Sequence, residues 1–393
     1  MTRIHLKKGR EESLLRRHPW LFSGAISRIE GEPYEGDIVS IISQSGECLG
    51  YGHFQIGSIA VRVLSFDDAA LSPDFWKERI GAAYRHRLSL SLNNTNCYRL
   101  VHGEGDMLPG LIVDWYNGVA VVQAHSVGMF LSLDKISDAL REVYGKELKA
   151  IYDKSSGTAP FNAGLDLNDG FLYRNEDFSD EREGIVMENG HKFIVNWEEG
   201  QKTGFFLDQR ENRALVERYA AGRNVLNLFS YTGGFSIYAL AGGATGVDSV
   251  DSSAKAVAMM ERNVALNDFP NHHSFCEDAI DFVKNSPFGK YDMMIVDPPA
   301  FAKHRGAIRN ALRGYQRLNA SAISKIASGG IIFTFSCSQV VDSTSFALTI
   351  FSAAAETGRN VKILDRLNQP ADHPVNIFHP EGEYLKGLIL YVE

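Results

Sequence analysis

The sequence predicts an α/β protein whose C-terminal half is a doubly wound parallel sheet, preceded by a small β-barrel and a central α/β unit. Two observations lead to this prediction. From about residue 185 onward, short apolar runs alternate with longer stretches of helical periodicity, which is typical of a parallel sheet with right-handed crossovers. In the first 70 residues, short runs of β-branched and aromatic residues are separated by glycine-containing breaks, which favours a barrel of short strands.

The composition is that of a globular protein with several cores. The chain has 393 residues, of which 44% are hydrophobic and 22% charged, enough for two or three domains. The cysteines Cys48, Cys97, Cys276 and Cys337 lie far apart without a C-x-x-C pair, so we expect neither disulfides nor a metal. No apolar run approaches the ~18 residues that span a bilayer, and no secretion signal is evident. We therefore expect a cytoplasmic protein without a membrane partner.

Three domains are predicted, over residues 1–70, 71–184 and 185–393. In the first, the strands are expected in GDIVSIIS, CLGYGHF and SIAVRVLSF. The second begins with a helix in DFWKERIGAAYRHRLSL and continues with strands in LIVDWY and VAVVQAH and a helix in SLDKISDALREVYG. The polar segment SDEREG, residues 179–184, is the expected linker.

The third domain contains the alternating pattern. Its parallel strands are expected in NVLNLFS, TGVDSVD, HSFCED, YDMMIVDPP and GGIIFTFSCS, each followed by a helix. The tail segments VKILDRLNQ and YLKGLILYVE read as two final strands, paired as a hairpin with a long connection.

Polar residues and glycines follow the first of these strands. The loop runs through Asn227, Phe229, Ser230, Tyr231, Thr232 and Gly233-Gly234, at the carboxyl edge where open α/β sheets bind ligands. The dinucleotide fingerprint G-x-G-x-x-G is missing, and a simple helix-start turn explains the two glycines equally well.

Acidic residues end the next three strands. Asp251 lies about 20 residues beyond the glycines, where a carboxylate can accept hydrogen bonds from both hydroxyls of a ribose. Asp278 lies where an adenine amino group could be recognised. Asp297 opens the loop Asp297-Pro298-Pro299, which its prolines make rigid enough to orient a flat polar substrate.

In this order, these strand ends resemble the class I (Rossmann-like) S-adenosylmethionine-dependent methyltransferases, over roughly residues 185–393. The two final strands resemble the antiparallel edge of the same fold. Upstream, the segment 201–210 is read either as a lid that packs on the core or as part of the cofactor site. In the second reading, which the resemblance favours, Phe205 and Phe206 wall the cofactor while Asp208, Gln209 and Arg210 hold its amino-acid end.

Cys337 follows the fifth strand, beside the strand that ends at Asp297. Carbon 5 of cytosine is a poor nucleophile, and a thiolate added to carbon 6 makes it enamine-like. We therefore interpret Cys337 as a catalytic nucleophile and the other three cysteines as buried and inert. Asp297 is the candidate to bind the N3/N4 edge of the base and to stabilise charge as the thiol adds. No cysteine follows the two prolines, so the base that removes the carbon-5 proton is not identified.

The amino-terminal 28 residues are basic, although the net charge of the chain is −8. A local basic patch on an acidic chain indicates contact with a few phosphates, and a solvated surface is the alternative. The candidate RNA-binding residues are Lys7, Lys8, Arg10, Arg16, Arg17 and His18.

Further motifs extend the resemblance to nearly the whole chain. Residues 17–26, RHPWLFSGAI, resemble the opening of a PUA domain, a small RNA-binding barrel. Trp20 is expected to pack in the core of this barrel, and stacking on an RNA base is the alternative. The segments GEGDMLPGL, DPPAF, RGY and ADHP resemble the family of 23S ribosomal RNA (cytosine-5) methyltransferases that join PUA, central α+β and methyltransferase domains. The resemblance implies S-adenosyl-L-methionine as cofactor and 23S ribosomal RNA, or a large-subunit precursor, as partner. A homodimer is left open.

Three rival functions are considered. An RNA N-methyltransferase could use the DPP loop without a thiol. A non-catalytic RNA-binding assembly factor could retain the fold without the activity. A small-molecule methyltransferase would leave the basic N-terminal barrel without a purpose.

Overall fold

The computed structural model describes residues 1–160, 164–179, 181–302 and 304–393. These residues form two compact units with interleaved segments. The first unit comprises residues 1–186, 195–207 and 371–382, and the second comprises 187–194, 208–370 and 383–393. The three-domain division with boundaries at 70 and 184 stays a prediction.

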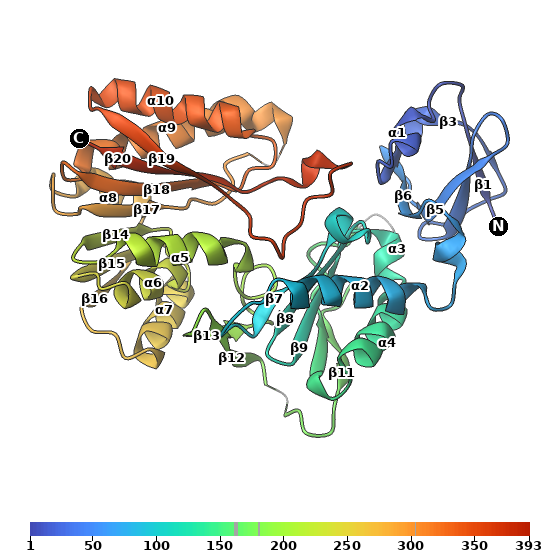
Figure 1. Cartoon of the computed structure of the whole chain (residues 1–393), viewed down its shortest axis with the longest axis horizontal. Coiled ribbons are helices and arrows are strands. Elements are labelled where there is room, and N and C mark those ends of the chain that lie inside the picture. Colours follow the sequence, from blue (N-terminus) through green and yellow to red (C-terminus); the bar gives the residue numbers. More distant parts are fainter. Residues whose placement is uncertain (161–163, 180, 303) are drawn as a thin grey trace. The chain divides into compact units, whose positions relative to one another are not determined.

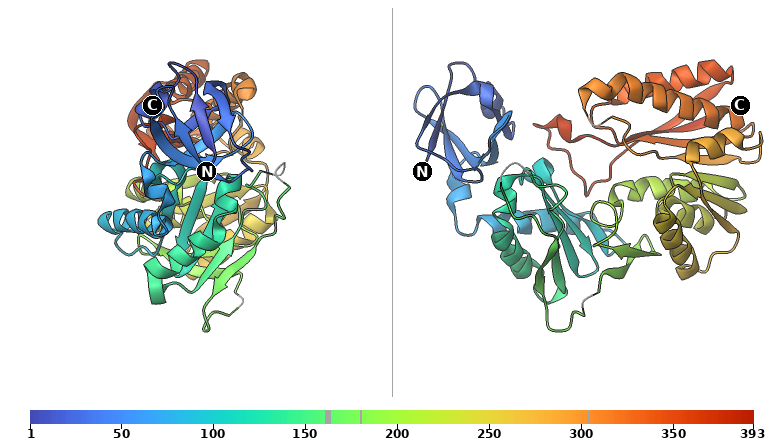
Figure 2. Two further views of the ribbon diagram at one scale, coloured as in Figure 1. Left: turned by 90° about the vertical axis from the view of Figure 1, so that its right-hand side faces the viewer. Right: turned by 180° about the vertical axis from the view of Figure 1, so that it is seen from behind.

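The first unit begins with a six-stranded sheet in the order β2-β6-β5-β4-β1-β3, whose strands curve around one another in Figure 2. The buried side chains Ile4, Leu21, Val39 and Val61 form its core. The elements are β1 (Arg3–Leu6), α1 (Glu12–Leu15), β2 (Trp20–Phe22), β3 (Ile26–Glu30), β4 (Ile38–Ile42), β5 (Cys48–Phe54) and β6 (Ile59–Ser65). The predicted strands are therefore confirmed as β4, β5 and β6.

A five-stranded sheet in the order β11-β10-β9-β8-β7 follows, with helices α2 and α4 packed against it. Its elements are α2 (Phe75–Ser89), β7 (Cys97–His102), β8 (Leu111–Tyr116), β9 (Val119–Ala124), α3 (Val127–Phe130), α4 (Leu133–Tyr144), β10 (Ala150–Asp153) and β11 (Gly170–Arg174). The predicted helices and strands of this part are confirmed. The expected linker at 179–184 is partly wrong, because strand β12 (Glu183–Glu188) begins within it and pairs with β13 (His191–Asn196).

The second unit contains a seven-stranded sheet in the order β16-β15-β14-β17-β18-β20-β19. The first five strands of this order run parallel, and β20 is antiparallel to both of its neighbours. The strands are β14 (Asn224–Leu228), β15 (Gly246–Asp251), β16 (His272–Cys276), β17 (Met293–Val296), β18 (Gly330–Ser336), β19 (Val361–Asn368) and β20 (Lys386–Val392). The predicted parallel sheet and its antiparallel edge are both confirmed.

Helices cover the two faces of this sheet. Figure 1 shows α9 and α10 side by side over one face, with α5, α6 and α7 grouped together on the other. The helices are α5 (Arg210–Tyr219), α6 (Gly234–Ala241), α7 (Ala254–Leu266), α8 (Ala279–Asn285), α9 (Ile308–Lys325) and α10 (Ser343–Thr357). No helix in the described ranges is both long and apolar enough to cross a bilayer.

The register of the sheet brings distant loops to one edge. Leu228 at the end of β14 pairs with Val250 of β15 and with Val296 of β17. Val296 in turn pairs with Thr334 of β18. Asp251 is the last residue of β15, Asp297 directly follows β17, and Cys337 directly follows β18, which extends past the end of β17. All three therefore lie at the carboxyl edge of the sheet.

The connection between β19 and β20 leaves the second unit. Residues 371–382 pack with the first unit, where the Asp372 carbonyl accepts a hydrogen bond from Arg87 Nη2 at 2.9 Å. Arg87 also forms a buried ion pair with Asp106, and the Asp372 carboxylate accepts the backbone N–H of Arg99 at 3.0 Å. The predicted long connection is thus an ordered part of the other unit.

A buried histidine makes the stability of the first unit depend on pH. The imidazole of His53 is buried against Gly128, where an added Cβ would lie 2.2 Å from its Cγ. This burial lowers the pKa of His53 to about 4. The unfolded chain binds a proton near pH ~6.5 and the folded chain does not, so the free energy of unfolding falls as pH drops through this window. At about 1.4 kcal/mol per pKa unit, the free energy of unfolding falls by about 3 kcal/mol once the pH is below the pKa of the folded state.

Chemical denaturation at about pH 7.5 and about pH 5 measures this effect. We expect His53→Leu, which cannot be protonated, to show a smaller drop than the wild type. An equal drop in the two proteins would assign the pH dependence to other groups.

Candidate active site

The loop after β14 has an unusual backbone conformation. Phe229 and Tyr231 have φ angles of 58° and 47°, and Gly233 has 84°. Left-handed conformations are costly for residues with a side chain, and they concentrate at ligand-binding loops. The chain therefore holds strain at the position where open α/β sheets bind their ligands.

The two glycines of this loop are required by packing as well. A Cβ at Gly233 would lie 2.7 Å from Met260 Cγ, and one at Gly234 would lie 3.2 Å from Arg213 Cδ. Arg213 is fixed beneath the loop by a buried bidentate ion pair with Glu188, at 2.8 and 2.7 Å. The glycine pair thus allows α6 to begin close to this ion pair, which the sequence alone did not indicate.

Buried polar atoms near this loop lack partners within the described part of the chain. They are Asn227 Oδ1, Ser230 Oγ and Thr232 Oγ1. The Asn227 side chain is held in place, because its Nδ2 donates to Ser236 Oγ at 2.8 Å. A buried polar atom without a hydrogen bond costs about 1–3 kcal/mol, so this group of atoms is suited to a polar ligand.

Asp251 is oriented by the same loop. Its Oδ2 accepts the backbone N–H of Tyr231 and its Oδ1 that of Ser253, both at 2.9 Å. Each carboxylate oxygen has a further lone pair, so Asp251 can still accept from two neighbouring hydroxyls. This geometry fits the role predicted for it with a ribose.

The remaining predicted polar residues have partners within the second unit. Asp278 caps α8 by accepting the N–H groups of Ile280 and Asp281 at Oδ1, which leaves Oδ2 for any contact with a ligand. Asp208 accepts the hydroxyl of Tyr384 at 2.7 Å. Gln209 Nε2 donates to Asp297 Oδ2 at 3.0 Å, which links the start of α5 to the DPP loop. Arg210 is buried.

Phe205 and Phe206 belong to the first unit. Phe205 is buried, and its carbonyl accepts the Tyr116 hydroxyl at 3.4 Å, whereas Phe206 is half-buried under the Lys202 ammonium. Their role as walls of a cofactor site stays a prediction.

Cys337 lies at the end of β18 and beside the DPP loop. Its thiol is half-buried, with Sγ 4.0 Å from the Pro298 carbonyl oxygen. The expectation that the other cysteines are buried is correct for Cys97 and wrong for Cys48 and Cys276, which are exposed near strand ends. Solvent exposure alone therefore does not distinguish Cys337 from the other cysteines. Its position beside the DPP loop does distinguish it.

Lys386 is a buried cation that contacts the segment directly after Cys337. Only 5% of the residue is exposed, and its Nζ donates to the carbonyl oxygens of Ser338 and Val341. Burial lowers the pKa of the Lys386 amine, and charge on Cys337 opposes this shift. A positive charge on Lys386 and a negative charge on Cys337 would therefore stabilise each other.

Comparison with known proteins identifies the family. Residues 166–388 match the model of S-adenosylmethionine-dependent methyltransferases, and residues 4–66 match that of PUA-like domains. "Ribosomal RNA large subunit methyltransferase I" of Aeromonas salmonicida is 39% identical over 394 residues, covering 98% of each chain. The chain belongs to this family of S-adenosylmethionine-dependent methyltransferases.

Other relatives agree with this assignment. The protein of the same name from Escherichia coli (strain SMS-3-5) is 37% identical over 396 residues, covering 98% of each chain. Among solved structures, a putative methyltransferase from Streptococcus mutans superposes with a TM-score of 0.83 over 100% of both chains at 24% identity, a likeness of fold. The predicted fold, with a class I methyltransferase domain and an N-terminal PUA-like domain, is thereby confirmed.

The site suits the cofactor of the family. S-adenosyl-L-methionine carries an adenosine with a ribose diol, and it supplies an electrophilic methyl group when bound. Asp251 offers two acceptors for the diol, and the unpartnered atoms of Asn227, Ser230 and Thr232 offer further hydrogen bonds.

Replacing Asp251 is expected to weaken cofactor binding. Asp251→Asn keeps the shape of the side chain but loses the charge and one acceptor, so we expect the dissociation constant for S-adenosylmethionine to rise by roughly 10- to 100-fold. Titration calorimetry measures this change.

Asp248→Asn is the matched control on the same strand. Asp248 binds Lys290 and Tyr291 at 2.8 and 2.6 Å, so this variant should lose stability and keep its cofactor affinity. Equal loss of affinity in both variants would contradict the assignment of Asp251 to the ribose.

The basic residues predicted in the PUA-like domain lie at its surface. Lys7, Lys8, Arg10, Arg16 and Arg17 are exposed, while His18 is half-buried. Arg16 pairs with Glu12, and Lys7 Nζ donates to the Gly24 carbonyl at 2.9 Å. The expectation for Trp20 is wrong: its half-buried indole lies outside the barrel core, donates to Glu104 at 2.8 Å and packs on His379.

Proposed function

We propose that this protein methylates carbon 5 of a cytosine in 23S ribosomal RNA, using S-adenosylmethionine and a covalent bond between Cys337 Sγ and carbon 6. The observation that supports the proposal most is the position of Cys337, half-buried beside the Pro298 carbonyl at the end of the strand next to Asp297. The relatives that cover nearly the whole chain carry names that refer to large-subunit ribosomal RNA.

The thiol and the DPP loop divide the chemistry between them. Addition of the thiolate to carbon 6 raises the electron density at carbon 5. Asp297 would bind the N3/N4 edge of the base, and its carboxylate is oriented by the Gln209 amide. Carbon 5 would then take the methyl group, whose bond to the sulfonium breaks and leaves its electron pair on that sulfur. A base would remove the proton from carbon 5 as the Cys337 thiolate leaves carbon 6.

Lys386 would maintain the reactive state of the thiol. A free thiol with a pKa of ~8.5 is only a few per cent ionised at neutral pH, so the site must favour the thiolate. The Lys386 ammonium is buried close to the loop that carries Cys337 and is held by two carbonyl oxygens.

RNA would be held by the PUA-like domain through its exposed Lys7, Lys8, Arg10 and Arg17. The target cytosine must leave its stack to reach the site, at a cost of a few kcal/mol.

Release of tritium from RNA carrying tritium at carbon 5 of cytosine tests the proposal. Methylation at carbon 5 must release this label, whereas methylation of a nitrogen keeps it. We expect tritium release in step with methyl transfer, and mass spectrometry of 23S RNA from cells without the protein should show one missing methyl group.

The rival functions give different results in the same assay. Methyl transfer with full retention of tritium would indicate an RNA N-methyltransferase that uses the DPP loop alone. RNA binding without detectable affinity for S-adenosylmethionine would indicate a non-catalytic assembly factor.

A further inference from the structure

Helix α9 carries a row of exposed arginines that the predicted RNA-binding residues do not include. Arg309, Arg313 and Arg317 are spaced by four residues, and Arg305 precedes them by the same interval. All four side chains are exposed. Residues four apart lie on one side of an α-helix, about 6 Å apart along its axis, so Arg309, Arg313 and Arg317 form a row on α9. Arg305 lies in the 3-10 turn Arg305–Ala307 that precedes this helix. We name these four residues the arginine ridge.

The positive charge of the arginine ridge is not balanced by acidic residues in the surrounding stretch of sequence. Between Asp297 and Asp342 the sequence contains no Asp or Glu, although the chain as a whole has a net charge of −8. Across the part of the chain that the structure describes, no ion pair involves any of the four arginines. Of the acids on the adjacent α10, Glu356 accepts from Gln316 at 3.2 Å, and Asp342 accepts the N–H and hydroxyl of Ser345.

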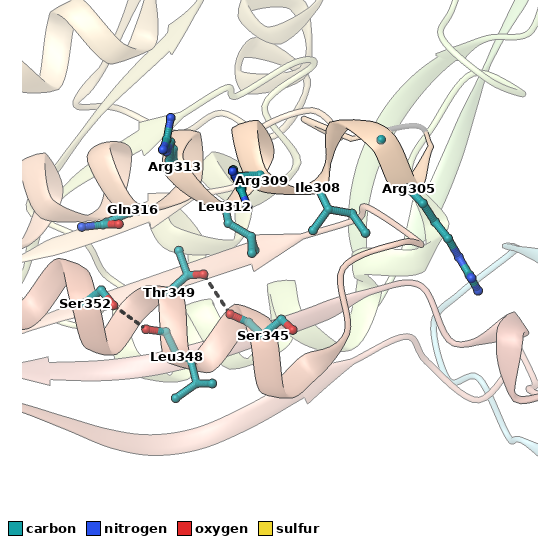
Figure 3. Close-up of a pocket in the computed structure, with 11 residues that line it drawn as sticks. Arg305, Ile308, Arg309, Leu312, Arg313, Gln316, Ser345, Leu348, Thr349 and Ser352 are labelled. Atoms are coloured by element: carbon teal, nitrogen blue, oxygen red, sulfur yellow. Dashed lines mark hydrogen bonds between the residues drawn. The ribbon is translucent and has the colours of Figure 1, made fainter.

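The ridge lies between two hollows in the surface. One, of about 600 Å³, runs between α9 and α10, and Figure 3 shows Ile308 and Leu312 pointing into it while Arg313 points away from α10. The second lies along α9 and is lined by Asn310, Arg313, Gln316 and Arg317. Arg313 and Gln316 line both hollows.

The lining of the first hollow suits a sugar–phosphate chain. Ser345, Thr349 and Ser352 place hydroxyl groups along α10, and Leu348 beside them is 60% exposed. The Thr349 and Ser352 hydroxyls donate to the carbonyls of Ser345 and Leu348, which leaves their lone pairs able to accept from ribose hydroxyls.

The opposite side of α9 supports the catalytic loop. Tyr315 is buried, and its ring is tilted against that of Phe301 of the DPP loop, with the ring centroids 4.6 Å apart. Its hydroxyl forms a hydrogen bond of 2.9 Å with Ser338 Oγ, next to Cys337. Gly314 leaves room for Phe301, because a Cβ there would lie 3.0 Å from the ring. The same helix thus presents arginines to solvent and fixes the loop of the proposed nucleophile.

We infer that the arginine ridge binds the phosphate backbone of the RNA strand next to the target cytosine. Arginine forms bidentate hydrogen bonds with phosphate, and a row of exposed arginines with no acidic partners is suited to successive phosphates of one strand. This inference rests on the proposed function, since it takes RNA as the substrate.

The test uses the full-length protein with Arg309→Ala, Arg313→Ala and Arg317→Ala combined. The probe is a fluorescein-labelled stem-loop RNA with unpaired cytosines, titrated by anisotropy at several salt concentrations. We expect the dissociation constant for the RNA to rise roughly 10- to 100-fold. The plot of the logarithm of the association constant against the logarithm of the salt concentration should become less steep, by about two to three in the magnitude of its slope. Cofactor affinity and the melting temperature should stay at wild-type values.

Two further variants sharpen the result. Replacing the same three residues by Lys keeps the charge, so most of the salt slope should return. The matched control replaces three exposed cations outside α9, Lys192, Arg218 and Arg262, by Ala. It should bind the RNA like the wild type.

The outcomes separate the ridge from the proposed function. An unchanged salt slope in the triple alanine variant, or an equal loss in the control, overturns the inference even if the protein methylates RNA. Poly-glutamate that competes as well as RNA of equal charge would assign the ridge to an acidic protein and also overturn it. Absence of methyl transfer by the wild type, with ridge-dependent RNA binding intact, would contradict only the proposed function.

Discussion

Replacing Cys337 by Ala is expected to abolish methyl transfer while cofactor binding is kept. Without the thiol, carbon 5 of the base is not activated, so we expect kcat to fall by at least roughly a thousandfold. The affinity for S-adenosylmethionine should remain, because Asp251 and the loop after β14 are unchanged. Transfer of radiolabelled methyl groups to RNA, together with titration calorimetry, measures both quantities.

Cys276→Ala is the matched control for this variant. Cys276 is a free and exposed cysteine at the end of β16, another strand of the same sheet. It should retain wild-type activity. If Cys337→Ala keeps activity within roughly tenfold of the wild type, the covalent mechanism is wrong and nitrogen methylation becomes the better assignment.

Replacing Lys386 by Met is expected to shift the pH dependence of the reaction to higher pH. Loss of the ammonium raises the pKa of the neighbouring thiol, so a smaller fraction is ionised at neutral pH. A shift of about one pKa unit lowers kcat/KM roughly tenfold near pH ~7 and moves the rising limb of the profile up by the same amount. Activity should therefore recover as the pH is raised.

A purely structural role of Lys386 gives a different profile. Lys386 also binds two carbonyl oxygens, so its loss could lower stability and reduce activity equally at every pH. Lys386→Arg keeps the positive charge and should keep the wild-type pH profile. A uniform reduction in Lys386→Met without a shift would remove Lys386 from the activation of Cys337.

The sequence predicted the second unit well because buried parallel strands have a strong local pattern. The strands β14, β17 and β18 are short and mostly apolar runs, and their carboxyl ends lie at one edge of the sheet. The interleaving of the two units was not predictable. The partners of Asp372, Arg87 and Arg99, lie more than 270 positions away, a separation that local periodicity does not encode.

For the candidate site, the sequence predicted which residues carry the chemistry. It did not predict the backbone conformation or the neighbouring side chains that position them. Asp251 and Cys337 follow strands and could be inferred from position alone. The left-handed conformations of Phe229 and Tyr231 are adopted by residues that do not favour them, so composition gave no signal. Lys386 was overlooked because a lysine at the start of the last predicted strand ordinarily reads as solvated, whereas β20 pairs on both sides and Lys386 is buried.

The placement of β20 has a consequence for how the enzyme matures. β20 comes after β19 in the chain, yet it lies between β18 and β19 and pairs with both. Until β20 joins the sheet, β18 and β19 therefore have no common partner, and the buried amine of Lys386 is not in place. Activation of the thiol by this amine would then accompany closure of the sheet rather than precede it.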